Sequence, residues 1–109
     1  MKISIRDVGD AKVVEVEGDV DLGTSPELRS ALYDSLPRVA RVAVNLQAIR
    51  YIDSSGIATF IEVLRDSQRM KKEFVLFGLS PAVLQVFKLT HVIRLFRVFQ
   101  TEQEALEAV

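Results

Sequence analysis

The sequence predicts a single α/β domain: a small mixed β-sheet with helices packed mainly on one face. Its 109 residues match the usual size of one domain. About half of the residues, 49%, are hydrophobic, so a core can form without disulfides. In some segments apolar and polar residues alternate one by one, and in the segments between them apolar residues recur every three or four positions. This succession is typical of strands that alternate with helices.

The first two strands are expected next to each other near the N-terminus. Residues 3–8 alternate between apolar and polar side chains and are followed by Gly9. Three valines within residues 13–16 mark a second strand, which Gly18 closes. Because only a short turn separates the two strands, we expect them to form an antiparallel hairpin.

A first helix is predicted after a short polar connection. Thr24 or Ser25 can serve as its N-cap, and Pro26 lies in the first turn, where a missing N–H costs nothing. Pro37 ends the helix. The apolar residues of the helix recur every four positions: Leu28, Leu32 and Leu36.

A third strand and a second helix follow. The strand is expected over the alternating residues 42–46, and the helix is expected to begin at Ser54. The helix carries apolar residues at the spacing of one buried face. These residues are Ile57, Phe60, Ile61 and Leu64.

The C-terminal part predicts two more strands and two more helices. Residues 74–77 form a continuous apolar run, typical of a strand buried on both faces. A helix begins at Ser80-Pro81, and a last strand is expected over residues 95–99. Residues 101–104 spell a capping box that opens a short terminal helix. Strands joined through helices are expected to be parallel. The side chains expected to point inward from the helix at Ser80-Pro81 are Val83, Leu84 and Phe87.

Composition excludes several classes of function. There is no cysteine, so disulfides, thiolate catalysis and cysteine-bound metals are excluded. The net charge is −1, and without a basic excess we expect no binding to nucleic acid. The N-terminus alternates like a strand and not like a signal peptide, and no apolar run approaches the ~20 residues of a membrane span. We therefore expect a soluble, cytoplasmic protein without membrane insertion.

The segment Asp53-Ser54-Ser55-Gly56 concentrates polar chemistry at the predicted start of a helix. The free N–H groups and the dipole of a helix N-terminus stabilise an anion, so a phosphate on a serine there would be favoured. Asp53 or Ser54 would be the N-cap, and Gly56 would let a bulky partner approach the backbone. The local spelling alone favours an ordinary helix cap, because these residues are the preferred N-cap set.

The wider sequence resembles the STAS-domain family, and within it the bacterial anti-sigma factor antagonists. The resemblance covers nearly all of residues 1–109, which we take as one STAS domain. Its parts occur in the order of the family and are as follows: Gly18-Asp19-Val20-Asp21, Val44-Asn45-Leu46, Tyr51-Ile52-Asp53-Ser54-Ser55-Gly56, Ser80-Pro81-Ala82-Val83, and the closing Phe87, Leu95 and Phe96.

The resemblance implies a phosphorylation-controlled switch in transcription regulation and no enzyme. The acceptor would be Ser54, with Asp53 positioning its hydroxyl, Asp21 on the same surface, and Ser55 as a capping or substrate-orienting neighbour. Gly56 and Ile57 would complete the partner-binding site. The partner would be an anti-sigma factor that is itself a serine kinase and binds ATP and magnesium. It would bind the unphosphorylated form, and a serine phosphatase would reset the switch.

The resemblance also allows an alternative and shows departures. STAS domains serve as adaptors of transport complexes, for anions or in lipid ABC systems, and of sensory complexes, and these bind a partner without phosphorylation. Residues 70–73, Met-Lys-Lys-Glu, stand where many members have glycines, so this connection is expected to differ in shape. Residues 57–60 are bulkier than the small residues frequent in antagonists, which is expected to affect partner choice.

Other constellations are weaker. Ser54 and His91 could form a nucleophile and base, but the turn of a nucleophile elbow is missing, and His91 more simply closes a helix. Asp19, Asp21 and Asp53 could together hold magnesium, although Asp19 and Asp21 are more simply turn and cap residues. No glycine pattern of a nucleotide-binding loop is present, so we expect no cofactor and no metal in the chain itself.

Apolar residues flank the polar corner and leave one question open. Leu22, Val20 and Ile57 could form an apolar rim around the site, as an interface needs, or could belong to the core. The sequence does not separate these two interpretations.

Overall fold

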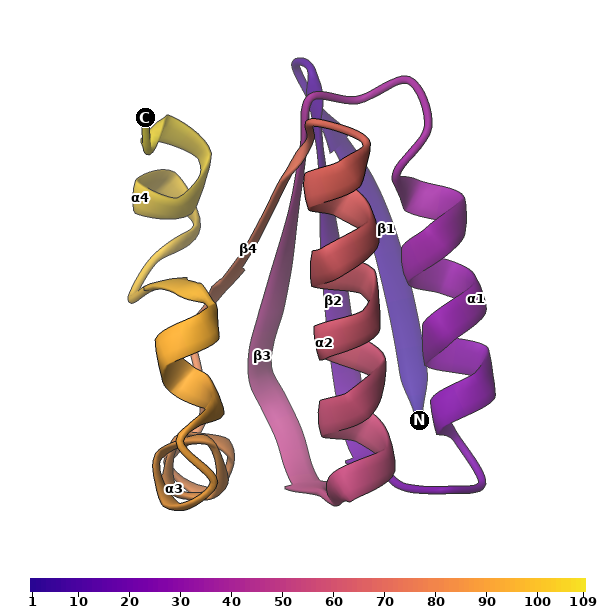
Figure 1. Cartoon of the computed structure of the whole chain (residues 1–109), viewed down its shortest axis with the longest axis vertical. Coiled ribbons are helices and arrows are strands. Elements are labelled where there is room, and N and C mark those ends of the chain that lie inside the picture. The colour runs from indigo at the N-terminus through magenta and orange to yellow at the C-terminus, as the bar shows by residue number, and fades with distance from the viewer.

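Five strands form one mixed sheet in the computed structural model, which describes all residues, 1–109 (Figure 1). The strands lie side by side in chain order. The hairpin of β1 and β2 is antiparallel, and every later pair is parallel, as predicted. The strands are β1 (Lys2–Val8), β2 (Ala11–Val20), β3 (Arg41–Ile52), β4 (Glu73–Phe77) and β5 (Arg97–Phe99).

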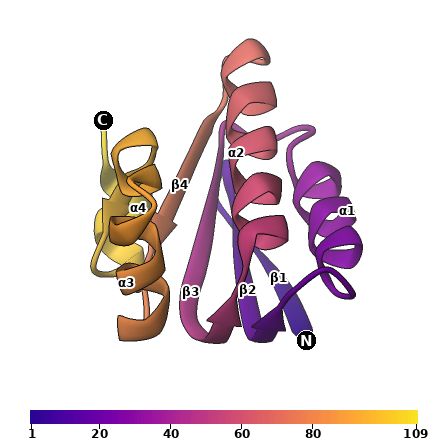
Figure 2. The same cartoon turned by 60° about the horizontal axis from the view of Figure 1, so that its bottom comes forward.

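Four α-helices and one short 3₁₀-helix connect or follow these strands. They are α1 (Ser25–Ser35), α2 (Ser54–Arg69), α3 (Pro81–Leu89), the 3₁₀-helix η1 (Val92–Leu95) and α4 (Glu102–Glu107). Figures 1 and 2 show α2 lying between α1 and α3. The predicted capping box is present at the start of α4, where the Thr101 and Glu104 side chains bond to each other's backbone N–H.

The main core lies between one face of the sheet and three of the helices, as the fold class predicted. Alternate strand residues such as Val14, Val44 and Leu76 are completely buried there. They pack against apolar residues of α1, α2 and α3 and against Leu36, the C-cap of α1; the helix residues are Leu28, Leu32, Phe60, Val63, Leu64, Val83 and Phe87. Three helices on one face leave the other face to be covered separately.

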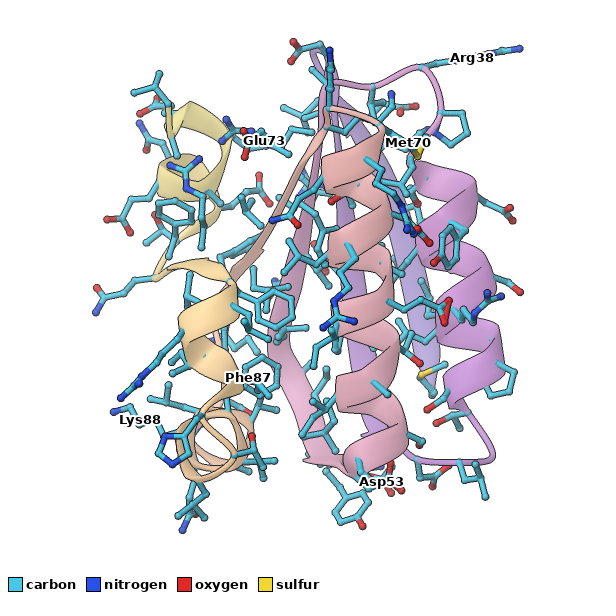
Figure 3. The ribbon with its side chains drawn as sticks, in the orientation of Figure 1. Arg38, Asp53, Met70, Glu73, Phe87 and Lys88 are labelled. Atoms are coloured by element: carbon cyan, nitrogen blue, oxygen red, sulfur yellow. The ribbon has the colours of Figure 1, made fainter.

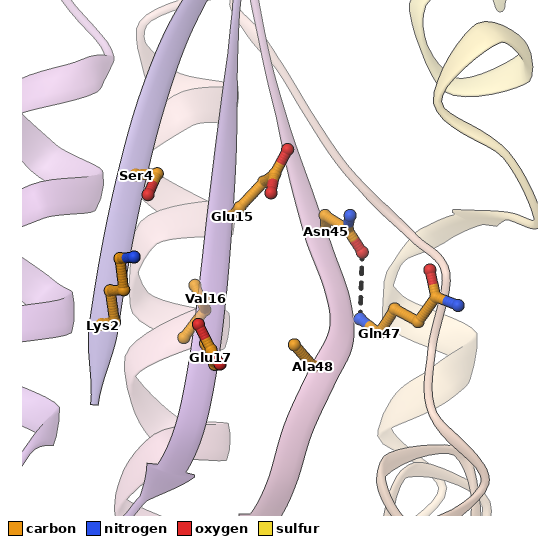
Figure 4. A pocket seen from close by; sticks show the side chains of 8 residues that line it. All are labelled: Lys2, Ser4, Glu15, Val16, Glu17, Asn45, Gln47 and Ala48. Atoms are coloured by element: carbon orange, nitrogen blue, oxygen red, sulfur yellow. Dashed lines mark hydrogen bonds between the residues drawn. The ribbon is translucent and has the colours of Figure 1, made fainter.

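The second face is divided between a small apolar cluster and an open polar area. Helix α4 places Ala105 against Val13, Ala43, Val75 and Phe77. The remainder, over β1, β2 and β3, is a shallow polar hollow of about 340 Å³ (Figure 4). Its lining includes Lys2, Ser4, Glu15, Glu17, Asn45 and Gln47. This half of the sheet therefore faces solvent with polar side chains.

Two segments differ from the sequence-based expectation. The last strand is only Arg97–Phe99, because residues 92–95 instead form η1. Leu84 was expected to point inward but is partly exposed, and only Val83 and Phe87 of α3 are buried. Helix α3 therefore packs against the sheet along a narrower stripe than its apolar sequence predicted.

The connection between α2 and β4, residues 70–73, contains no glycine but has one residue in a glycine-like backbone conformation. Helix α2 is capped at its C-terminus by Met70, and Lys71 follows with φ of 60°. This left-handed conformation is adopted routinely only by glycine. The Lys72 ammonium group donates a hydrogen bond to the Val39 carbonyl at 2.6 Å, which anchors the turn to the neighbouring loop.

Candidate functional site

The candidate site lies where β2 and β3 end and where α1 and α2 begin. Because β2 and β3 are parallel, their carboxyl ends meet at the same edge of the sheet. Figure 3 shows Asp53 at this end of α2 and Met70 at the opposite end. The topology thus brings the loop at Asp21 and the segment 53–56 together, as the sequence analysis expected.

Asp53 is the N-cap of α2. Its Oδ1 accepts hydrogen bonds from the Ser55 N–H at 2.9 Å, the Gly56 N–H at 3.4 Å and the Ser55 hydroxyl at 2.5 Å. The Ser55 hydroxyl, together with the backbone N–H groups of Ser55, Gly56 and Leu22, holds the pKa of the Asp53 carboxyl below its usual range, although partial desolvation opposes this. Asp53 is therefore charged near neutral pH.

The two serines of the motif have different environments. Ser54 is exposed, and its hydroxyl forms no hydrogen bond within the protein. Ser55 is partly buried, and its hydroxyl contacts Asp53 and, at 2.9 Å, the hydroxyl of Ser25 in α1. We expected Asp53 to position the Ser54 hydroxyl, but its carboxylate is bonded to Ser55 instead. Of the two hydroxyls, only that of Ser54 is free to face a reagent in solution.

A link between Ser25 and Ser55 ties the start of α1 to the start of α2. Ser25 is buried, and its hydroxyl also lies 2.7 Å from the Asp21 carbonyl, to which it can donate. The hydroxyls of Ser25 and Ser55 make three contacts: with the Asp21 carbonyl, with each other and with the Asp53 carboxylate. They supply only two protons, because the carbonyl and the carboxylate can only accept. One of the three contacts therefore lacks a hydrogen at any moment. The sequence indicated Ser25 only as a possible helix cap, so this link was missed.

Asp21 and Asp19 do not converge with Asp53 on a metal site. The Asp21 carboxylate accepts hydrogen bonds from the Gly23 N–H at 2.9 Å and the Thr24 N–H at 3.1 Å, as a turn residue does. Asp19 lies 3.7 Å from the guanidinium of Arg50. No group of three or more acidic or histidine side chains in the chain is placed to hold a metal ion.

Gly56 and Ile57 are not available to a partner. A Cβ on Gly56 would lie 2.6 Å from Cγ1 of Val20 and 2.9 Å from Cγ1 of Ile52. The glycine therefore allows α2 to approach the strands closely. We expected it to open the backbone to a partner, and it does not. Ile57 is only 8% exposed and belongs to the main core, which corrects its assignment to the partner-binding site.

The apolar rim is formed by different residues from those that the sequence offered. Val20 is completely buried, so Val20 and Ile57 both belong to the core. Leu22, by contrast, is 78% exposed, and Tyr51, which the sequence analysis did not consider for this role, is 53% exposed. Tyr51 is two residues before Asp53 in the chain, and the backbone N–H of Leu22 interacts with the Asp53 carboxylate. An exposed rim beside Ser54 therefore consists of Leu22 and Tyr51.

A charged cluster joins α1 to α2 beyond the site and was also missed. Glu62 accepts hydrogen bonds from the Arg29 guanidinium at 2.7 Å and the Tyr33 hydroxyl at 2.9 Å. The Tyr33 hydroxyl also contacts Asp66. The bonds from Tyr33 and Arg29 lower the pKa of Glu62, whereas desolvation and the bond to Glu62 raise the pKa of Tyr33. No local sequence pattern indicates this cluster, because Arg29 and Tyr33 lie some thirty positions before Glu62 in the chain.

His91 lies apart from the serine motif in the chain and closes a helix. It follows Thr90, the C-cap of α3, and has φ of 62°. Its backbone N–H donates to the Lys88 carbonyl. The structure therefore supports the simpler of the two interpretations of this residue.

These features define a class of protein: a small α/β domain whose helix N-terminus presents one free serine hydroxyl beside a charged cap. Comparison with known proteins gives the family. The STAS domain family model matches residues 2–105, and the chain belongs to this family.

Relatives and solved structures agree with this assignment. The chain is 32% identical over 78 residues to the anti-sigma-B factor antagonist of Staphylococcus aureus, covering 71% of this chain and 72% of the relative. The structure of an anti-sigma factor antagonist from Mycobacterium paratuberculosis superposes with a TM-score of 0.88 at 23% identity, covering 99% and 92% of the two chains. The phosphorylated form of SpoIIAA, a Bacillus cell fate determinant, superposes with a TM-score of 0.75 at 19% identity, covering 97% of each chain.

No helix of the protein combines the length and the apolar character that crossing a bilayer requires.

Proposed function

We propose that the protein is an anti-sigma factor antagonist whose binding to an anti-sigma factor is controlled by phosphorylation of Ser54. The observation that carries the site assignment is the free, exposed hydroxyl of Ser54 at the start of α2, next to the occupied hydroxyl of Ser55. The antagonist role is supported by the relatives, which are named as anti-sigma-B factor antagonists.

The proposed role of Ser54 is that of a substrate for another protein's catalysis. The partner would be a serine kinase that brings its own ATP and magnesium, and a phosphatase would reverse the reaction in the cytoplasm. A structural neighbour, SpoIIAA, is described in both unphosphorylated and phosphorylated forms, which supports a reversible modification. We propose no catalytic residue and no cofactor in this chain.

The electrostatics of the cap support an outward-facing phosphate. The N–H groups of Ser55 and Gly56 are already bonded to the Asp53 carboxylate, so they do not form a free cradle for a phosphate. Phosphorylation adds about −1.5 to −2 charge beside this charged carboxylate. Repulsion from Asp53 would direct the phosphate toward solvent, where a docked partner meets both its charge and its bulk.

The proposed binding surface combines this switch with the apolar rim. Ser54 and the carboxylates of Asp21 and Asp53 form its polar part, and Leu22 and Tyr51 its exposed apolar part. Exposed apolar residues next to a phosphorylation site suit a reversible interface. They would contact the partner, and a phosphate added beside them would bring an unpaired charge into the interface, which is costly and favours dissociation.

The test uses the purified chain, ATP and the cognate kinase, with intact-mass measurement and mapping of the modified residue. One phosphate is expected on the wild type and on Ser55→Ala, and none on Ser54→Ala. Ser54→Asp is expected to weaken binding to the kinase. Phosphorylation that persists in Ser54→Ala would contradict the site assignment, and binding unaffected by Ser54→Asp would favour the adaptor alternative.

A further inference from the structure

Helix α3 has an apolar surface that the protein itself does not cover. Its nine residues include only two polar ones, Gln85 and Lys88. Only Val83 and Phe87 are buried, whereas Leu89 is 71% exposed and Leu84 is partly exposed. A helix that is apolar on nearly all sides is normally buried. An exposed apolar patch that polar residues border is typical of an interaction site.

The outer face of α3 is bordered by two hollows that meet at Pro81 and Leu84. The first, of about 330 Å³, is lined by Pro81, Leu84, Gln85, Lys88 and Leu89. The second, of about 650 Å³, is lined by the start of α3, the segment after β4, the end of β5 and Gln47 of β3, and it adds apolar side chains such as Leu79 and Phe99. The two hollows share Pro81 and Leu84 and form one surface, apolar along α3 and bordered by polar side chains, which we call the α3 surface.

The chain segment that forms most of this surface carries charges of one sign. No aspartate or glutamate occurs between residues 74 and 101, although the whole protein has a net charge of −1. Of the three basic residues other than histidine in that segment, only Arg97 has an acidic partner, Glu73. Lys88 and Arg94 are exposed and form no ion pair within the protein. Figure 3 shows Lys88 pointing outward from α3, away from α2.

We propose that the α3 surface docks an amphipathic helix of a partner protein whose apolar stripe is flanked by carboxylates. The apolar stripe would cover Leu84 and Leu89, and the carboxylates would pair with Lys88 and Arg94. Helix α3 is nine residues long, or about 13 Å, which matches two to three turns of a partner helix. Recognition of a helix by i, i+3, i+4 and i+7 anchors in an apolar groove is a common binding mode.

Two other occupants fit less well. Binding to an anionic lipid surface usually needs a cluster of about four to eight basic residues, whereas the unpaired ones here are Lys88, which lines the surface, and Arg94 in the following η1. A second copy of the chain would have to offer its own acidic helix, α4. That helix is already packed, because Ala105 is completely buried and the Arg41 guanidinium holds the carbonyls of Ala105 and Ala108.

The α3 surface shares no residue with the Ser54 site, so the inference does not rest on the proposed function. Ser54 begins α2, and the α3 surface begins at Pro81 beyond β4. A partner held there could remain bound in both phosphorylation states of Ser54.

The test uses a fluorescent synthetic helix of about 18 residues, long enough to hold a helix in water, with leucines along one stripe and glutamates beside them. A matched peptide carries lysines in place of the glutamates. Anisotropy titrations are expected to show saturable binding of the glutamate peptide and much weaker binding of the lysine peptide. Amide chemical-shift changes are expected to map to residues 81–95.

Variants of the protein sharpen the test. Leu89→Ser and Lys88→Glu are each expected to weaken binding at least about tenfold, equivalent to about 1.4 kcal/mol. The matched controls are Met70→Ser, another exposed apolar residue, and Arg65→Glu, another exposed cation without an ion pair, and both should bind as the wild type does. Circular dichroism and thermal unfolding of each variant verify that it is folded.

Several results would overturn the proposal. One is the absence of saturable binding by the glutamate peptide, and another is equal binding of both peptides. Shift changes centred on residues 51–56 would place the contact elsewhere. Binding to vesicles that contain phosphatidylserine, lost in Lys88→Glu, would replace the protein partner by a membrane. Self-association in sedimentation velocity, lost in Leu89→Ser, would replace it by a second copy.

Discussion

Helices α2 and α3 pack against the same face of the sheet but present opposite chemistry to solvent. Both begin with a side-chain N-cap, Asp53 and Ser80, and both bury a phenylalanine completely. The outer face of α2 carries the ion pairs of Glu62 and Asp66 with Arg29 and Arg69, whereas the outer face of α3 is largely apolar, with Gln85 and Lys88 as its polar residues. A helix can pack on the sheet and still have a polar outer face, as α2 does, so folding does not require an apolar outer face. The apolar outer face of α3 therefore indicates a requirement other than folding.

The largest effect is expected where the two helices are alike. Phe60 of α2 and Phe87 of α3 are both completely buried, so Phe60→Ala and Phe87→Ala should each lower the free energy of unfolding by about 3–5 kcal/mol. Urea unfolding measures this. A clearly smaller loss for Phe87→Ala would mean that α3 is only loosely docked, and the comparison of the helices would then fail.

The close approach of α2 to the strands can be tested at Gly56. Gly56→Ala should improve helix propensity, but its Cβ would meet Val20 and Ile52, so we expect a net loss of about 1–3 kcal/mol. The reverse change at a neighbouring exposed position, Ala58→Gly, should cost about 1 kcal/mol through propensity alone. A stabilised Gly56→Ala protein, measured by thermal unfolding, would rule out the tight contact.

The two serines at the start of α2 should differ in their effect on stability. Ser55→Ala removes contacts to Asp53 and Ser25 and should lower the free energy of unfolding by about 1 kcal/mol. Ser54→Ala removes an exposed hydroxyl without partners and should change it by less than about 0.5 kcal/mol. Equal losses in urea unfolding would contradict the different environments of the two serines.

The cap of α2 should make stability depend on pH in a way that the cap of α3 does not. The lowered pKa of Asp53 means that the folded state favours its charged form. This contribution is fully present above the ordinary pKa of about 3.9 and is lost as pH falls through the lower folded pKa. Asp53→Asn should therefore cost more stability at pH 6 than at pH 3, and thermal unfolding at both values measures this difference.

The smallest effect is expected at the exposed end of α3. Leu89→Ser should change the free energy of unfolding by less than about 0.5 kcal/mol, because the side chain is mostly in solvent. Thermal unfolding measures the change, with Phe87→Ala as the contrasting variant in the same helix. A large loss would show that Leu89 serves the fold and would remove the reason to assign it to a partner.

The sequence by itself determined the fold class, the hairpin, the parallel pairs and the starts of α2, α3 and α4. These follow from local signals: the alternation of residues 3–8, the caps at Ser80 and Thr101, and the apolar run at residues 74–77. It also indicated the candidate functional corner at residues 53–56, because capping residues and small hydroxyls there are neighbours in the chain.

Only the tertiary structure decided how these residues are used. The bond between Ser25 and Ser55, the burial of Gly56 and Ile57, and the exposure of Leu22 and Leu89 all depend on which elements lie side by side. Periodicity shows which residues can share a face, but a neighbouring element decides whether that face is covered. For the same reason, the choice of Ser54 over Ser55 acquired a physical basis only once α1 lay beside α2.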